Sequence, residues 1–420
     1  DSFNTAVGYN AGNAVTTGTL NTLVGGLAGD ALTTGFNNVA MGYEALGSNT
    51  ASGAHVAIGY QALKTLNSTT NSSQFNTAVG ANAGLSVTTG VENTIVGGLA
   101  GDAITTGYYN TALGKDALTT NTLSSFNVAI GHSALKTMSA GNAETYNVAV
   151  GGNAGLSVTS GVQNTLIGGL AGDALTDADA NVAIGIGALG SDTLGSLSVA
   201  VGANALNAQN LTTATNTYSV AVGHFAGAAV TTGVENTLIG GLAGDALTVG
   251  VRNVAVGKGA LTTDVGGNKS VAIGHSALEA QNLGATTTDA FNTAVGYNAG
   301  SAVTTGIQNT FVGGSAGDAT NDGAENVAVG YAALSANCGN GNGAFGYAAL
   351  FQCTGQFNTA VGTSAGSAVT SGGNNLFLGK DTGLSGSPGG SSTTESNVIF
   401  LGDENITNIY AAVSSIGTSD

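Results

Sequence analysis

Five aspartates close copies of one short segment, Gly-Gly-Leu-Ala-Gly-Asp, with serine in place of the leucine in the last copy. Carboxylates at a regular interval are candidate calcium ligands, because calcium takes oxygen donors. Calcium-binding repeats bring carboxylates of consecutive turns together, whereas these segments lie roughly 70 residues apart. We therefore interpret the aspartates as turn-capping residues and keep an axial cation, bound between several chains, as an alternative. They are Asp30, Asp102, Asp173, Asp245 and Asp318.

Histidines and tyrosines share one position, directly after a recurring glycine. His132, His224 and His275 lie there without regular acidic or cysteine neighbours, so we predict neither a metal site nor a cofactor. Tyrosines at this position could stack on sugars, but we favour packing at a corner or between chains. They are Tyr9, Tyr43, Tyr60, Tyr297, Tyr331 and Tyr347.

The two cysteines, Cys338 and Cys353, are separated by nearly one local repeat length. If the repeats stack, the two residues lie almost above one another, within the Cα spacing that a disulfide accepts. An oxidised pair would fit an extracellular particle. The sequence leaves open whether the pair is oxidised or free.

The net charge excludes two classes of partner. Seven Lys and Arg residues stand against 24 Asp and Glu residues, which gives a formal net charge of −17. Nucleic acids and anionic membranes are bound through clustered Lys and Arg, so we expect neither as a partner. We also expect no membrane insertion, because no apolar run approaches the roughly 20 residues of a membrane helix. The chain opens at Asp1 without methionine, so we expect a processed product or a fragment.

One motif, Asn-Thr/Val-Ala-Val/Ile-Gly, recurs 22 times and organises the chain. Most of its glycines are 17 residues apart, and the interval lengthens after every fourth unit. The asparagine is replaced in four units, by His55 and by three serines. The first four units contain Asn4 and Gly8, Asn21 and Gly25, Asn38 and Gly42, and His55 and Gly59.

Units of 17 residues are too short for a strand followed by a crossover helix, which needs about 30 residues. They also show no helical periodicity. The motif therefore predicts an all-β fold, a parallel β-solenoid of about 22 coils whose short strands pair with those of the neighbouring coils. The glycine would take a corner with positive φ. The stacked asparagines would form an amide ladder along the axis.

Both faces of each predicted strand are apolar. The residue before the glycine, such as Val7, shares one face with a Thr or Val, and an Ala or Leu such as Ala6 lies on the other. One face can line the solenoid interior, which leaves the Ala/Leu face and a column of alanines typified by Ala11 without a partner. We therefore expect lateral packing of identical chains as a coaxial homo-oligomer. A monomeric solenoid whose alanines fit a narrow core is the alternative.

The four long units carry insertions near residues 64–75, 136–146, 207–218 and 279–291. Insertions in a solenoid leave the stack as loops, often on the binding face. Their polar composition suits contacts with glycans, although loops also tolerate insertions that have no function. The candidate receptor-contact residues are Asn67, Thr69, Asn71, Gln74, Asn142, Asn210, Thr212, Asn282 and Thr287.

The repeated unit, as in Asn4-Thr5-Ala6-Val7-Gly8 followed by Ala11, resembles the head repeats of trimeric autotransporter adhesins and, more closely, the repeat arrays of phage tail fibres. The resemblance covers about residues 3 to 380. It implies three chains and a left-handed coil.

The last residues resemble the segment that joins a phage fibre or tailspike to a self-cleaving intramolecular chaperone. They comprise Asn397-Val398-Ile399-Phe400-Leu401-Gly402 and a terminal Ser419-Asp420, where such chaperones commonly begin. We accordingly divide the chain into a repeat shaft (1–380), a Gly/Ser-rich loop (381–396) and a C-terminal β segment (397–420).

These observations predict a non-enzymatic, extracellular fibre that belongs to a virion, associates with itself and with other virion proteins, and attaches to a host-surface glycan or protein. A bacterial surface adhesin or extracellular filament is the main alternative. Recurring Thr-Thr-Gly, as at Thr16-Thr17-Gly18, keeps an ice-binding solenoid open, although its ranks are interrupted. A polysaccharide-cleaving tailspike would need paired carboxylates in a groove.

Overall fold

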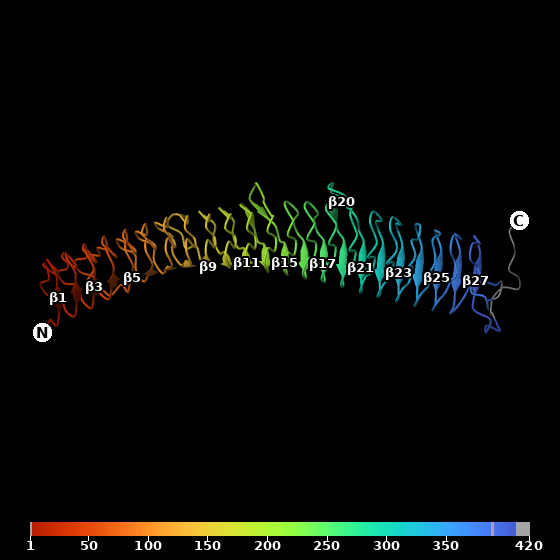
Figure 1. Ribbon diagram of the computed structural model, residues 1–420, viewed down its shortest axis with the longest axis horizontal. Helices are drawn as coiled ribbons and strands as arrows, with labels where there is room; N and C mark the ends of the chain where they lie inside the picture. The colour runs from red at the N-terminus through yellow and green to blue at the C-terminus, as the bar shows by residue number, and fades with distance from the viewer. Residues whose placement is uncertain (1, 388–389, 409–420) are drawn as a thin grey trace. The chain divides into compact units, whose positions relative to one another are not determined.

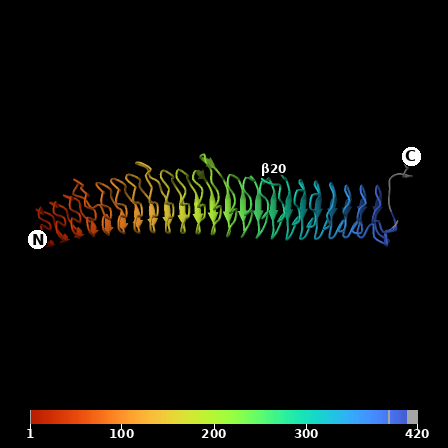
Figure 2. The ribbon, with the colours of Figure 1, turned by 45° about the horizontal axis from the view of Figure 1, so that its top comes forward.

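The computed structural model describes residues 2–387 and 390–408, and every regular element among them is a β-strand. The protein is an all-β parallel solenoid of about 22 coils, as the repeat predicts. It divides into two compact units, Asp1–Asn236 and Thr237–Asp420. In each unit the coils follow one another in chain order, and each contributes a short strand to the same side (Figures 1 and 2).

In the first unit, strands of three residues pair in parallel with the strands of adjacent coils. Their register joins equivalent repeat positions, so that Thr5 lies opposite Thr22 and Val7 opposite Val24. The strands are β1 (Thr5–Val7), β2 (Thr22–Val24), β3 (Val39–Met41), β4 (Val56–Ile58), β5 (Thr77–Val79), β6 (Thr94–Val96), β7 (Thr111–Leu113), β8 (Val128–Ile130), β9 (Val148–Val150), β10 (Thr165–Ile167), β11 (Val182–Ile184), β13 (Val199–Val201) and β15 (Val220–Val222).

The second unit repeats this arrangement. Thr310 lies opposite Val327, and Val312 opposite Val329, again in parallel register. The strands are β16 (Thr237–Ile239), β17 (Val254–Val256), β19 (Val271–Ile273), β21 (Thr293–Val295), β22 (Thr310–Val312), β23 (Val327–Val329), β24 (Gly343–Phe345), β25 (Thr359–Val361), β26 (Leu376–Leu378) and β27 (Ile399–Leu401).

The glycine that ends each strand, here called the corner glycine, is required by both conformation and space. Gly114 has a φ of +138°, and a Cβ atom there would overlap the carbonyl oxygen of Gly131 in the next coil. Because the obstacle is backbone, a side chain could be admitted only by separating the coils. The predicted corner role of the glycines is therefore confirmed.

The alanine columns lie inside each coil, and the expectation that they face another chain is wrong. Ala40 on the middle of its strand and Ala45, three residues after the corner glycine, are both fully buried. The coil is narrow, so small side chains are what its interior admits, as the monomeric alternative supposed. The opposite face of each strand, which carries the larger Thr, Val and Ile residues, points outward.

The insertions leave the coils as loops and add short parallel pairings beside the main strands. Strand β12 (Gly195–Ser196) pairs with β14 (Thr215–Asn216), and β18 (Gly267–Asn268) pairs with β20 (Thr288–Asp289). The other two insertions form single bridges, Gly53 to Ser73 and Ser125 to Glu144. The β20 loop stands out from the neighbouring coils of its unit (Figure 1).

The repeat continues beyond residue 380. Strand β27 pairs in parallel with β26, so that Leu376 lies opposite Ile399 and Leu378 opposite Leu401. Residues 397–402, which the sequence suggested as a separate segment, therefore add one more strand to the stack. The terminal Ser419-Asp420 lies outside the described residues.

Candidate functional site

Two residues of every main strand point outward and form what we call the outer strand face: the residue before the corner glycine and the residue two positions earlier. On β10 these are Thr165 and Ile167, on either side of the buried Leu166. No main strand within the described residues places a charged side chain on this face. The face is therefore an uncharged surface of Thr, Val and Ile that runs along each unit.

The outer strand face remains accessible in the single chain. Leu113 in the first unit is 44% exposed, and Phe345 in the second is 41% exposed. Scattered apolar residues on a surface need no explanation, but a contiguous apolar patch is typical of an interaction site. The outer strand face is thus the candidate functional surface.

The asparagine ladder is present, as the sequence predicts, and it bonds each coil in two directions. The Asn38 side-chain amide donates to Oδ1 of Asn21 at 3.1 Å, and the Asn38 backbone N–H donates to the same oxygen at 3.1 Å. Asn21 also donates to the carbonyl of Gly35, which closes its own coil. Asn4 begins the series by accepting from Asn21. One side chain therefore joins successive coils and fixes the turn of its own coil.

Buried polar clusters interrupt the apolar interior where a long coil meets the coil before it, which the repeat pattern does not predict. In the first, the Ser52 hydroxyl donates to Asn49 Oδ1 at 2.8 Å and contacts His55 Nε2 at 3.0 Å. Burial lowers the pKa of His55 to about 4, so the ring is neutral near pH 7. The sequence does show that histidine replaces the repeat asparagine at residue 55. It does not show that Ser52 and Asn49 of the preceding coil face this histidine.

Two later clusters replace the histidine with a carboxylate and an amide. Gln209 Nε2 donates to Asp192 Oδ2 at 2.6 Å, and Gln281 Nε2 donates to Asp264 Oδ2 at 2.6 Å. All four side chains are fully buried. Burial raises the pKa of Asp264. Each carboxylate accepts a hydrogen bond from a side-chain amide of the following coil. The two pairs therefore join successive coils.

Most candidate receptor-contact residues lie on exposed parts of the inserted loops, and one does not. Gln74 is 8% exposed, because its backbone N–H donates to Gly53 O at 3.0 Å and draws the residue back onto the preceding coil. Gln74 is therefore a poor candidate for contact with a receptor. The exposed residues are Asn67, Thr69, Asn71, Asn142, Asn210, Thr212, Asn282 and Thr287.

The recurring aspartates are partly buried at the coil edge rather than gathered. Burial raises the pKa of Asp102, Asp173 and Asp245. One carboxylate oxygen of Asp102, of Asp245 and of Asp318 is buried without a hydrogen-bond partner. Among the residues that the structure describes, no group of three or more His, Cys, Asp and Glu side chains could hold a metal ion.

Cys338 and Cys353 are both buried free thiols, so the disulfide that the sequence left open is not formed. The Thr320 hydroxyl lies 3.3 Å from Cys338 Sγ, and the Asn358 side-chain amide donates to Cys353 Sγ at 3.4 Å. Burial raises the pKa of Cys353 to about 11 and also raises that of Cys338. Cys353 lies seven residues after its corner glycine, as Asp264 and Gln281 do, whereas Cys338 lies eight residues after its own.

Threonine hydroxyls of the Thr-Thr-Gly segments bond to the next coil. Thr33 Oγ1 donates to Thr50 O at 2.9 Å, and Thr88 Oγ1 donates to Thr105 O at 3.2 Å. These hydroxyls therefore contribute to the stack itself.

Tyrosines after the corner glycines are exposed and stack along the coils where they are adjacent. The ring centroids of Tyr43 and Tyr60 are 5.8 Å apart, and those of Tyr331 and Tyr347 are 5.6 Å apart. His275 stacks on Tyr297 in the same way, at 5.5 Å. The position thus presents short aromatic ladders to solvent.

Comparison with protein-family models and with curated proteins identifies no relative. No helix within the described residues is long and apolar enough to cross a membrane. No protein-family model matches the sequence, and no curated protein matches it significantly.

Proposed function

We propose that the protein is a non-enzymatic structural shaft of a phage tail fibre or tailspike, which assembles from three copies and presents a host-binding surface. A β-solenoid fits structural proteins of the fibre and adhesin type. The observation that carries the proposal is the outer strand face, which is apolar and uncharged yet uncovered in one chain.

The size of this face supports burial against a partner. Strands about 4.8 Å apart and about 10 Å long present roughly 48 Å² per coil. The thirteen main strands described in the first unit then offer about 620 Å², and the ten in the second about 480 Å². These areas lie in the upper part of the range for the largest apolar patch of a typical monomer, about 300–600 Å², or just above it, and they approach the roughly 800 Å² that a standard interface buries per partner.

A second copy of the same chain is the partner that matches this surface along its length. The outer strand face contains one strand per coil, so its strands repeat at the spacing of the coils. An identical chain has strands at the same spacing and can therefore match this face along its length. Closed symmetry about a common axis lets every copy cover its outer strand face in the same way. The number three comes from the resemblance to phage fibres and trimeric adhesins.

The inserted loops supply the host-binding part of the proposal. Their exposed Asn and Thr side chains, such as Asn71 and Thr212, offer hydrogen-bond donors and acceptors for a surface glycan. A bacterial surface adhesin with the same stack is the second candidate. The gene region beyond residue 420 separates the two, because a chaperone domain supports the fibre and a membrane anchor supports the adhesin.

Native mass spectrometry tests the assembly. We expect a mass of three times 40.3 kDa, and a species of 40.3 kDa alone would contradict the proposal. Leu113→Lys should shift the population to the single chain, because it would bury an unpaired charge in the interface. Thr212→Lys adds the same charge on an exposed loop and should leave the assembly intact.

A further inference from the structure

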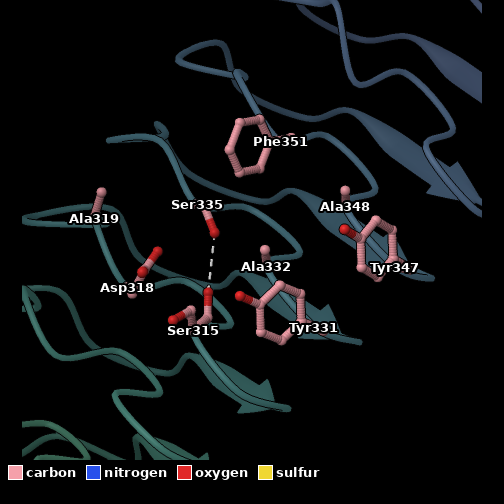
Figure 3. Close-up of a pocket in the computed structure, with 9 residues that line it drawn as sticks. All are labelled: Ser315, Asp318, Ala319, Tyr331, Ala332, Ser335, Tyr347, Ala348 and Phe351. Atoms are coloured by element: carbon pink, nitrogen blue, oxygen red, sulfur yellow. Dashed lines mark hydrogen bonds between the residues drawn. The ribbon is translucent and has the colours of Figure 1, made fainter.

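The second unit contains a groove that the repeat pattern alone does not reveal. It has a volume of about 560 Å³ and lies beside the coils of β22, β23 and β24. Tyr331, Tyr347 and Phe351 supply aromatic surface, and Asp318 and Ser335 supply polar groups. Figure 3 shows these side chains around a common space, with the Tyr347 hydroxyl pointing into it. The volume falls in the range of about 300–1,000 Å³ that is typical of small-molecule sites.

Comparison with the equivalent coils near the N-terminus shows why the groove is open. Tyr43 and Tyr60 correspond to Tyr331 and Tyr347 and stack in the same way. There, however, Glu44 accepts from Gln61 at 2.7 Å and pairs with Lys64 at 2.6 Å, and these three side chains occupy the space beside the rings.

The residues that would fill this space are replaced in the second unit. Ala332, Ala348 and Phe351 stand at the positions of Glu44, Gln61 and Lys64 in the repeat. The two alanines remove the polar network, and Phe351 replaces the cation with a ring that is 43% exposed. The backbone beside the rings is alike in both places, since φ is 54° at Glu44 and 53° at Ala332. Ser315, which also lines the groove, stands at the position of Leu27, so the groove results from these four replacements.

The polar side of the groove is formed by Asp318 and Ser335. One carboxylate oxygen of Asp318 is buried and has no donor. The corresponding oxygens of Asp102 and Asp245 are buried in the same way, so a ligand would reach Asp318 through the part of its side chain that lines the groove. The Ser335 hydroxyl already donates to Ser315 O at 3.0 Å, which leaves its oxygen lone pairs to accept from a ligand.

We propose that this groove, the Tyr331 groove, binds one hexopyranose residue of a neutral glycan. Aromatic rings pack against the apolar C–H face of a pyranose, and Asp318, Ser335 and the tyrosine hydroxyls hydrogen-bond with its hydroxyl groups. The inference names the ligand class of the host attachment and in that respect rests on the proposed function.

The charges and ring geometry favour a neutral sugar over other small ligands. Asp318 is the one ionisable carboxylate or amine lining the groove, and the chain carries a net charge of −17, so an acidic sugar would be repelled. A quaternary ammonium group is held by aromatic faces that converge around it. Tyr331 and Tyr347 are instead nearly parallel, with 16° between their planes.

The test is an array of neutral hexose oligosaccharides, followed by saturation-transfer NMR with the methyl glycosides of glucose, galactose and mannose. We expect binding that Tyr347→Ala weakens at least tenfold. Tyr43→Ala is the matched control, because it breaks an equivalent stacked pair without a groove, and it should leave the affinity unchanged. Asp318→Asn keeps the shape and should also weaken binding, through loss of the charged acceptor.

A second variant removes the groove with the chain's own residues. Ala332→Glu, Ala348→Gln and Phe351→Lys together reproduce the network of the N-terminal coils, so we expect a folded protein that has lost sugar binding. Absence of binding to any neutral glycan, binding that survives these changes, or preference for phosphocholine would overturn the proposal. So would protection of Tyr331 and Tyr347 from solvent by a second chain in the assembled protein.

The assembly state separates this result from the proposed function. If the protein is a trimer and binds no sugar, the proposal of sugar binding by the Tyr331 groove is rejected and the proposed shaft is retained. If the protein is a single chain and binds sugar, the proposed shaft is rejected and sugar binding by the groove is retained.

Discussion

Replacing Asn93 with alanine removes a rung of the amide ladder at a point where all its contacts are defined. Asn93 Oδ1 accepts from the backbone N–H of Asn110 at 3.0 Å, and Asn93 Nδ2 donates to Gly107 O at 2.9 Å. The neighbouring side chains keep other bonds, since Asn110 Nδ2 still donates to Ser124 O and Asn76 Oδ1 still accepts from the Asn93 backbone N–H.

The cost follows from the two backbone groups that lose these partners. Each buried polar group left without a partner costs about 1–3 kcal/mol, so Asn93→Ala should lower the stability of its coils by about 2–6 kcal/mol. Solenoid stability is a sum over neighbouring repeats, so the loss should be local. Asn93→Asp keeps the acceptor but loses the donor to Gly107 and buries a charge, and should be at least as damaging.

Urea unfolding with hydrogen-exchange mass spectrometry measures both the size and the place of the effect. Protection should fall in the coils of Asn76, Asn93 and Asn110 and stay unchanged in the second unit. Asn71→Ala, on an exposed loop, is the control and should stay within about 0.5 kcal/mol of the unaltered protein. A loss below about 1 kcal/mol for Asn93→Ala would refute the assignment of the ladder as a main source of inter-coil stability.

Three further predictions concern other interior positions. Gly114→Ala should lower the melting temperature strongly, whereas Gly152→Ala, where an added Cβ meets nothing within 4 Å, should have little effect; equal melting temperatures would contradict the corner role. His55 has a folded pKa of about 4 against 6.5 unfolded, so its contribution is complete above pH 6.5 and is lost by about 3 kcal/mol as the pH falls toward 4. His55→Asn should remove this part of the pH dependence in urea titrations, and an unchanged slope would count against it. Cys353, with its pKa raised to about 11, should react with iodoacetamide at pH 8 only after unfolding, and both cysteines should then be labelled without reductant; rapid labelling of the native protein would show that the thiols are not buried.

The repeat was enough to predict the fold, because every local preference agrees with it. The corner glycines, the asparagines and the short apolar strands each fit a parallel solenoid and fit no helical alternative. The prediction that the alanine face meets another chain failed for a physical reason. Alternation along a strand shows that successive residues lie on opposite faces, but both faces of these strands are apolar. Which face points inward is therefore decided by the width of the coil, whose narrow interior admits Ala40 and leaves the larger Met41 outside.

The candidate sites were less predictable, because they depend on which coils become neighbours. The exposure of Asn71 could be inferred from its inserted loop, whereas the burial of Gln74 results from one backbone bond to Gly53. The Tyr331 groove exists because small residues in two successive coils leave a space together. No single repeat contains that information, although aligning the sets of four coils would have shown the lost Glu, Gln and Lys.

The buried Asp264–Gln281 pair also bears on how nearly identical coils find the correct order. A chain whose strands all read alike could stack with one rung skipped at little loss of strand pairing. Skipping the coil of Gln281 would place Asp264 against Val303, which occupies the same interior position in the following coil. The Gly267 backbone N–H would still donate to Oδ1, but Oδ2 would lose its donor Gln281 in the dry interior. Burying a carboxylate without its hydrogen-bond partner is strongly unfavourable. The Asp264–Gln281 pair therefore favours the correct order of the coils over a stack in which one coil is skipped.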